Sequence, residues 1–216
     1  MKTQTNAAKL ASPQELTALV QEVLAEAGRQ GASAAEANIG MSQGLAVTVR
    51  LGEVETVEHN RDKSLGVTVY LGQRSGSAST SDLRPAALRD TVRAAVTIAK
   101  YIAADDCAGL ADPERLATTV PDLDLYHPWR FTLDEAIERA RACEQAARDV
   151  DSRIRNSEGA TLSSYEGLDV YGNTHGFIGA TATTRHSLSC AVIGQDASGM
   201  QRDYWYTLAR AAGDLE

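Results

Sequence analysis

Three segments of the chain carry apolar residues at helical spacing, and each begins at a recognisable start signal. The first covers residues 16–27 and follows Ser12-Pro13-Gln14-Glu15, a capping box with proline at the first helical position. A second helix is predicted from Asp82 and Pro85 to about Tyr101. A second capping box, at residues 132–135, predicts a third helix that ends near Val150.

Between the first two helices, the pattern changes to the alternation that is typical of β-strands. A tight turn at Gly52-Glu53 separates two of the runs and predicts a hairpin with one solvent-facing side. The last run consists of small residues. The predicted strands cover residues 37–39, 45–51, 54–58, 65–71 and 75–81.

The second half repeats the order of a capped helix followed by strands. Residues 104–130 are polar and hold three prolines, which predicts an irregular crossing between two subdomains. From residue 156 to residue 206, glycines interrupt short runs of Thr, Val, Tyr and Ile, and we interpret them as turns in a meander of about five strands. Residues 207–216 resemble the first turns of a further helix, and residues 1–11 a loose tail.

These elements predict an α+β fold, with helices packed on antiparallel, meander-rich sheets in two α+β subdomains. The first subdomain is predicted to comprise residues 1–120 and the second residues 121–216. Because the pattern of residues 207–216 predicts a helix that begins where the sequence stops, we expect the chain to be a fragment of a longer protein.

Composition narrows the class of protein. With 216 residues, 43% hydrophobic and 23% charged, the chain is expected to fold into a globular structure. A formal net charge of −8 argues against direct nucleic-acid binding. No secretory leader and no run of 18 apolar residues is present, which predicts a cytoplasmic protein without a membrane span.

Three widely spaced cysteines, Cys107, Cys143 and Cys190, predict reduced thiols rather than a disulfide framework or a zinc site.

Two patterns could carry chemistry. Residues 40–44 match GxSxG, but a nucleophile elbow requires a strand, a turn and a helix in that order, and strand residues follow here. A turn is therefore favoured over a hydrolase that uses Ser42. His175 and His186 could meet across neighbouring strands, with Cys190 as a third metal ligand; hydrogen-bonded histidines are favoured over that site.

Four residues are candidate contacts for a peptide or a partner protein. Arg185 and His186 lie in a polar cluster, residues 183–187, whose donors suit a carboxylate or a peptide backbone. Asn173 and His175 lie in a predicted turn. The alternative, which we favour, is a sheet edge decorated by polar side chains.

Several segments, in order along the chain, resemble one known family. They are GEVETVEHNRDKSLGVTVY, DLDLYHPW, ERARACEQAARDVDSRIRNSEGA, YGNTHGFIG and TRHSLSCAVI. Together they resemble the TldD/PmbA family, and YGNTHGF and TRHSLSC are most similar to its PmbA (TldE) branch. The resemblance extends from about Ala35 to Glu216, and members of that family are roughly twice as long as this chain.

The resemblance implies a cytoplasmic zinc metallopeptidase assembly. In that family a TldD subunit carries an HExxxH zinc helix and a later cysteine, and pairs with PmbA around a cavity where peptides and antitoxins are degraded and peptide antibiotics are matured. This sequence has no HExxxH, so no catalytic or metal-binding residue is carried over to it. We expect a non-catalytic subunit that forms a heterodimer with a TldD-type chain, which would hold the zinc, or a homodimer. The alternative that the resemblance implies is a regulatory protein similar to modulators of DNA gyrase.

Overall fold

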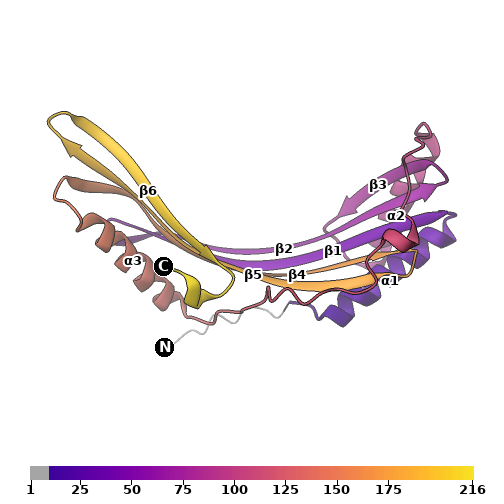
Figure 1. The fold of residues 1–216 in the computed structure, drawn as a ribbon, viewed down its shortest axis with the longest axis horizontal. Coiled ribbons are helices and arrows are strands. Elements are labelled where there is room, and N and C mark those ends of the chain that lie inside the picture. Colours follow the sequence, from indigo (N-terminus) through magenta and orange to yellow (C-terminus); the bar gives the residue numbers. More distant parts are fainter. Residues whose placement is uncertain (1–9) are drawn as a thin grey trace.

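The computed structural model describes residues 10–216, which form one long, curved antiparallel sheet with three α-helices (Figure 1). The strand order in the sheet is β3-β2-β1-β4-β5-β6. The elements are α1 (Pro13–Arg29), β1 (Ala34–Arg50), β2 (Glu53–Leu71), β3 (Arg74–Thr80), α2 (Pro85–Tyr101), α3 (Leu133–Arg148), β4 (Ile154–Asn173), β5 (Ile178–Asp196) and β6 (Gly199–Ala209). The predicted α+β class is confirmed. The predicted tail at residues 1–11 falls mostly outside the described residues.

All three predicted helices are present, and the local signals that start them account for their positions. In α1 the Ser12 hydroxyl accepts a hydrogen bond from the Glu15 amide at 3.2 Å, while the Glu15 carboxylate accepts one from the Ser12 amide at 2.6 Å. Thr132 and Glu135 form the same capping box at the start of α3. A capping box satisfies amides that the first helical turn leaves without partners, which fixes where each helix begins.

The predicted strands of the first half exist, but they are longer than the alternation indicates. β1 and β2 pair without a break from Ala34 and Tyr70 to Arg50 and Glu53, apart from one bulge at Thr48/Val49. The turn between them is at Leu51-Gly52, one residue earlier than predicted, and both residues have positive φ, 52° and 82°. Residues 40–44 lie inside β1, so the predicted turn there is wrong, because β1 has hydrogen-bonded neighbours on both sides.

The glycine-rich block from residue 156 to residue 206 forms three strands rather than about five. Gly167 and Gly172 lie inside β4 instead of marking turns. A Cβ atom on Gly172 would come within 2.7 Å of Val20 on α1, so this glycine permits the helix to lie close to the sheet. The helix predicted after residue 207 is also wrong, since β6 continues to Ala209 and a short 3-10 turn, Ala212–Asp214, follows it.

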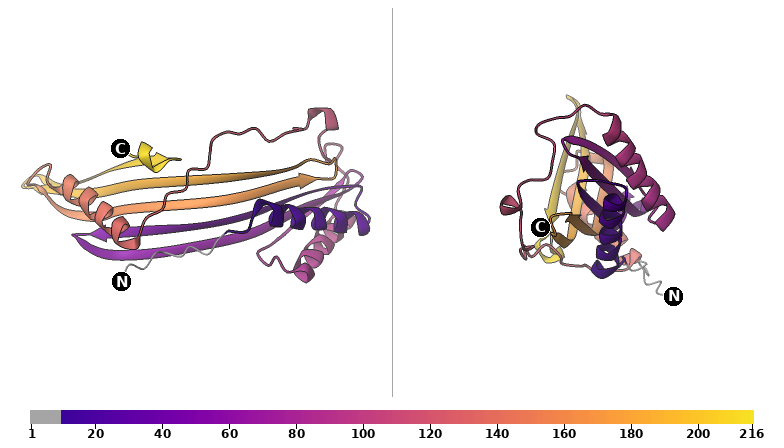
Figure 2. Two further views of the ribbon diagram at one scale, coloured as in Figure 1. Left: turned by 90° about the horizontal axis from the view of Figure 1, so that it is seen from below. Right: turned by 90° about the vertical axis from the view of Figure 1, so that its right-hand side faces the viewer.

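Two hydrophobic cores lie under opposite ends of the sheet, on its convex side (Figures 1 and 2). The first is built by α1, α2 and strands β1 to β4, and it includes Leu168 and Val170 from the second half of the chain. The second lies under α3 and includes Leu45, Val47 and Val49 from the first half. Strands from both predicted subdomains therefore contribute to both cores.

A buried carboxylate joins α3 to the turn between β1 and β2. Glu144 is only 1% exposed, and its two carboxylate oxygens accept hydrogen bonds from the backbone amides of Leu51 and Gly52, both at 2.8 Å. Arg141, one helical turn earlier, donates to the carbonyl of Gly52 at 2.9 Å. The helix therefore holds a turn that contains a non-glycine residue in the left-handed region.

The predicted irregular crossing is confirmed. Between α2 and α3 the chain forms only the 3-10 turn Pro113–Arg115 and otherwise runs without regular structure along the convex side, from the first core to the second (Figure 2). No helix within residues 10–216 has both the length and the apolar character needed to cross a membrane.

Candidate functional site

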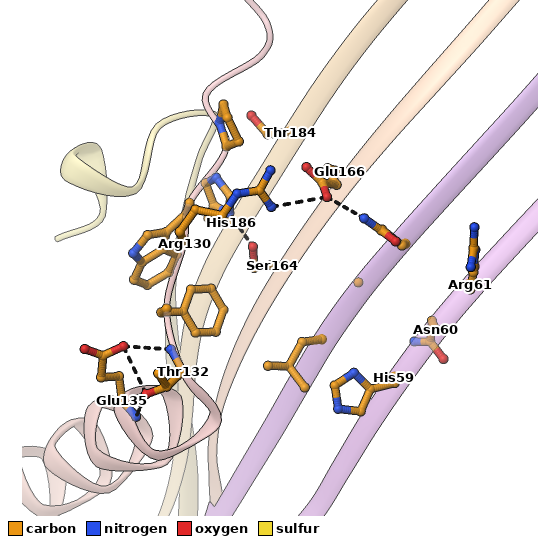
Figure 3. Close-up of a pocket in the computed structure, with 16 residues that line it drawn as sticks. His59, Asn60, Arg61, Arg130, Thr132, Glu135, Ser164, Glu166, Thr184 and His186 are labelled. Carbon is orange, nitrogen blue, oxygen red and sulfur yellow. Dashed lines mark hydrogen bonds and ion pairs between the residues drawn. The ribbon is translucent and has the colours of Figure 1, made fainter. Parts of the chain in front are cut away.

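A cavity of about 640 Å³ lies on the convex side of the sheet, where the end of the crossing segment meets the middle of the strands (Figure 3). Strands β1, β2, β4 and β5 supply one wall, and residues 128–132 with the first turn of α3 supply the other. Its lining residues are Gln43, Gly44, Leu45, His59, Asn60, Arg61, Pro128, Trp129, Arg130, Phe131, Thr132, Glu135, Ser164, Glu166, Thr184 and His186.

The apolar part of the cavity is formed by two aromatic rings and a leucine. Trp129 and Phe131 pack with their ring centroids 4.6 Å apart, and both are only partly buried. Leu45, on β1, is almost fully buried in the second core. Partly exposed aromatic rings inside a concave surface are typical of ligand pockets, because they offer a large apolar contact area.

Glu166 lies at one end of the cavity, and its carboxylate is surrounded by donors. It accepts hydrogen bonds from Gln43 at 2.5 Å, from the Tyr126 hydroxyl at 3.1 Å and from Arg130 at 3.5 Å. Its side chain is only 14% exposed, whereas that of Arg130 is 71% exposed. The negative charge of Glu166 is thus largely compensated within the chain, while most of the Arg130 guanidinium faces solvent.

His186 connects the crossing segment to the sheet. It is 1% exposed; its Nδ1 lies 2.9 Å from the hydroxyl of Ser164, and its Nε2 lies 3.0 Å from the backbone carbonyl of His127. Because a carbonyl oxygen can only accept, Nε2 carries a hydrogen and donates it. The imidazole also meets the ring of Trp129 edge-on, with centroids 5.5 Å apart. His186 therefore positions the aromatic wall of the cavity.

Thr184, two residues earlier on the same face of β5, holds the same segment. Its hydroxyl accepts from the backbone amide of His127 at 2.9 Å and donates to the carbonyl of Arg210 at 2.9 Å. Its amide donates to the carbonyl of Leu125 at 2.9 Å. Together with His186, these contacts hold the crossing segment in a fixed position along the edge of β5.

Of the four predicted contact residues, only His186 lines the cavity. Asn173 is buried, and its side-chain oxygen accepts from the amides of His175 and Phe177, so it stabilises the turn between β4 and β5. His175 is exposed in that turn. Arg185 is also exposed, on the opposite face of the sheet from His186, because side chains alternate along a strand. A role in peptide or partner contacts stays a prediction for all four.

His175 and His186 do not meet, and the favoured alternative, a hydrogen-bonded histidine, is confirmed for His186. His186 pairs with Ser164 in the middle of β4, whereas His175 lies in the turn beyond the end of that strand. Within residues 10–216, no cluster of three or more His, Cys, Asp or Glu side chains is arranged to hold a metal ion. The described residues therefore do not fit the zinc ion of the TldD/PmbA family.

Ser42 lies in the interior of β1, opposite Asp62 on β2 and Gly167 on β4. The strand continues past it for eight residues. A nucleophile elbow needs a sharp turn into a helix that lifts the serine out of the sheet, and this position does not have that geometry.

Two of the three cysteines lie together. All three thiols are free, and the Cys190 thiol on β5 hydrogen-bonds to Cys143 on α3, which lowers the pKa of Cys143 to about 7. The same contact and burial raise the pKa of Cys190. Cys107 is exposed in the crossing segment.

The sequence interpretation missed Trp129, Arg130, Phe131 and Glu166. A signal for three of them exists, because an aromatic pair that flanks an arginine stands directly before the second capping box, in a segment that is otherwise polar. An apolar residue just before a helix cap usually packs onto the first turns of that helix, so this pattern indicates rings that are anchored against α3. Glu166 has no such signal.

The fold class of this chain is defined by an antiparallel sheet of long strands. The α-helices and the described crossing segment all lie on one side of that sheet. Residues 126–216 match the model of the PmbA/TldA metallopeptidase central domain, and residues 35–99 match that of PmbA/TldA metallopeptidase domain 1. The chain belongs to the PmbA/TldD family, as predicted.

Curated relatives support the PmbA branch. The chain is 50% identical to the metalloprotease PmbA of Escherichia coli O157:H7 over 182 residues, which cover 84% of this chain and 40% of that protein. It is 45% identical to the metalloprotease PmbA homolog of Haemophilus influenzae over 206 residues, which cover 95% of this chain and 46% of the relative. The chain thus spans less than half the length of these relatives.

Solved structures share the fold. A proposed modulator of DNA gyrase from Bacteroides thetaiotaomicron superposes with a TM-score of 0.86 at 26% identity, over 96% of this chain and 47% of that one. TldE from Thermococcus kodakarensis superposes with a TM-score of 0.74 at 15% identity, over 91% of this chain and 44% of that one.

Proposed function

We propose that this chain forms part of a non-catalytic, PmbA-type subunit of a cytoplasmic peptidase, in which a TldD-type partner supplies the zinc ion. The observation that carries the proposal is the match of both halves of the chain to PmbA/TldA metallopeptidase domains, together with relatives named metalloprotease PmbA. On this proposal the substrates are unfolded peptides, antitoxins or precursors of peptide antibiotics.

The edge strand β6 offers a surface that suits a partner subunit. Its backbone pairs only with β5 among the described strands. Its side chains are exposed on both faces, and they include five large apolar ones: Met200, Tyr204, Trp205, Tyr206 and Leu208. Aromatic residues and methionine are enriched in protein interfaces, and exposed apolar patches mark interaction sites.

The test is co-purification of this chain with a TldD-type chain from the same source, followed by a peptidase assay on an unfolded peptide. We expect a stable complex whose cleavage activity is lost when the metal is chelated and restored by added Zn²⁺. A pair that neither associates nor cleaves any peptide would end the proposal.

A substitution on β6 tests the interface separately. We expect Trp205→Ala to weaken the complex at least tenfold, because exposed aromatic residues often dominate interface energies. Tyr101→Ala is the matched control, since Tyr101 is 87% exposed at the end of α2 and Trp205 is 78% exposed. Equal affinities for the two variants would exclude β6 as the interface while leaving the peptidase proposal in place.

A second candidate function is regulation of DNA gyrase, which the description of the Bacteroides protein suggests. In that case the chain would bind a gyrase subunit and alter DNA supercoiling without a TldD-type partner. A supercoiling assay with the purified chain distinguishes the two functions. The acidic charge of −8 makes a protein partner a better target than the DNA itself.

A further inference from the structure

The proposed peptidase role assigns no task to the cavity between the crossing segment and the sheet. It lies on the convex side, under the middle of the strands, and the proposed partner surface is the edge strand β6 (Figures 1 and 3). Its volume of about 640 Å³ is in the range of sites that hold small organic ligands, roughly 300–1,000 Å³.

The apolar wall fits a flat or branched hydrocarbon group. Trp129 is held in place by the imidazole of His186 and by the guanidinium of Arg139, which lies 5.1 Å from its ring centroid, and Phe131 packs against Trp129. Because these contacts fix the rings before any ligand binds, little conformational entropy is lost on binding.

The charged groups around this wall favour an anion. Both carboxylates that line the cavity already have donors: Glu166 has the three described above, and Glu135 accepts from the amide of Thr132 at 2.7 Å and from its hydroxyl at 3.1 Å. Arg130, by contrast, is 71% exposed; it donates to Glu166 at 3.5 Å and also contacts the Tyr126 hydroxyl, which leaves part of the five N–H groups of a guanidinium facing solvent. Arg61 lies across the cavity on β2 and adds a second positive charge to the rim (Figure 3).

We propose that this cavity binds an apolar carboxylate, with an aromatic or branched aliphatic group against Trp129 and Phe131 and the carboxylate at the guanidinium of Arg130. A carboxylate matches the planar donor fork of arginine, and a ligand carboxylate could approach the guanidinium more closely than Glu166, which lies 3.5 Å away. The same chemistry is found in a free aryl or branched-chain acid and in the C-terminal residue of a peptide.

Trp129 makes binding directly measurable. The chain has two tryptophans, so Trp205→Phe leaves Trp129 as the single fluorescent reporter, inside the cavity. This variant would be titrated with N-acetyl-phenylalanine and with its amide, N-acetyl-phenylalaninamide. We expect saturable quenching by the acid with a dissociation constant of about 1 mM or tighter, and at least tenfold weaker binding of the uncharged amide.

Variants of two arginines separate a specific contact from bulk charge. In the Trp205→Phe background, Arg130→Gln should weaken binding of the acid about tenfold and leave binding of the amide unchanged. Arg93→Gln is the matched control, because Arg93 also pairs with a carboxylate, Asp90 at 2.8 Å, but lies on α2 at the far end of the sheet. Circular dichroism of each variant shows that the fold is retained.

Two results would overturn the proposal: equal affinities for the acid and the amide, or equal affinities of the Arg130→Gln and Arg93→Gln variants for the acid.

A third arm of the experiment identifies the source of the ligand. A tetrapeptide that ends in Phe and binds at least tenfold more tightly than N-acetyl-phenylalanine would indicate a peptide C-terminus, and equal affinity would indicate a free acid; both support the shared chemistry. The assay contains no TldD-type chain, so its outcome is independent of the proposed peptidase function.

Discussion

The buried carboxylate of Glu144 should contribute more to stability than any other single charge on α3. It is 1% exposed and receives two amide hydrogen bonds, both at 2.8 Å, from Leu51 and Gly52. Hydrogen bonds to charged groups contribute about 1.5–3 kcal/mol each. Glu144→Ala removes the acceptor from both amides, so we expect a loss of about 3–5 kcal/mol in the free energy of unfolding.

Glu144→Gln should have an intermediate effect. The glutamine oxygen can still accept from one of the two backbone amides, but the glutamine NH2 group is a donor and cannot accept from the other. We expect a loss of about 2–3 kcal/mol. The matched control is Glu138→Gln on the exposed side of the same helix, where an ion pair with Arg141 should contribute only about 0–1 kcal/mol. Urea denaturation at neutral pH measures all three variants, and a Glu144→Ala protein within about 1 kcal/mol of the wild type would refute the reasoning.

The same carboxylate predicts a pH dependence. Burial opposes ionisation of Glu144, but hydrogen bonds from the Ser157 hydroxyl and from the amides of Gly52 and Leu51 outweigh it, so its pKa lies below the ordinary value of 4.5. A pKa that is lower in the folded state than in the unfolded state adds stability above the unfolded value, and that stability is lost as the pH falls through the folded value. The stability difference between the wild type and Glu144→Gln should therefore shrink below about pH 4.5. A difference that stays constant through acidification would contradict the assignment.

Two further predictions concern packing and the crossing segment. Gly76→Ala on β3 should destabilise the protein by about 1–3 kcal/mol, because its Cβ would collide with the backbone of α2. Gly66→Ala on β2 is the control: its Cβ would enter open space, so its thermal unfolding should be close to that of the wild type. His186→Ala should make residues 125–131 more sensitive to limited proteolysis, because the hydrogen bond to the carbonyl of His127 is lost; His175→Ala, in an exposed turn, should leave the cleavage rate unchanged.

The parts of the fold that depend on neighbouring residues were predictable from the sequence. Both capping boxes involve residues three positions apart, so Ser12 and Thr132 could be recognised before any tertiary contact was known. The stripe of apolar residues on α1 likewise predicts the face that is buried in the first core.

The length of the strands was not predictable in the same way. The sequence around Gly44 predicts a turn, yet Gly44 lies in β1. Its cross-strand partner is Tyr165 on β4, and the tyrosine ring occupies the space that a side chain at Gly44 would need. That pairing joins residues 121 positions apart and has no local signature. The cavity could not be predicted from the sequence for the same reason, since Trp129 and Phe131 meet Leu45 only after the crossing segment has folded back along the sheet.

The separation of the two hydrophobic cores has a mechanical consequence. At each end, helices and strands form two packed layers, while among the described residues no α-helix covers the middle of the sheet, where the crossing segment and the C-terminal residues lie (Figure 2). A single layer bends more easily than a double one, so the curvature of the whole molecule should be set near residues 41–44 and 165–167. The cavity is lined by residues of this part of the sheet, so we expect a ligand bound in it to stiffen the arch and to restrict changes in the distance between its two ends.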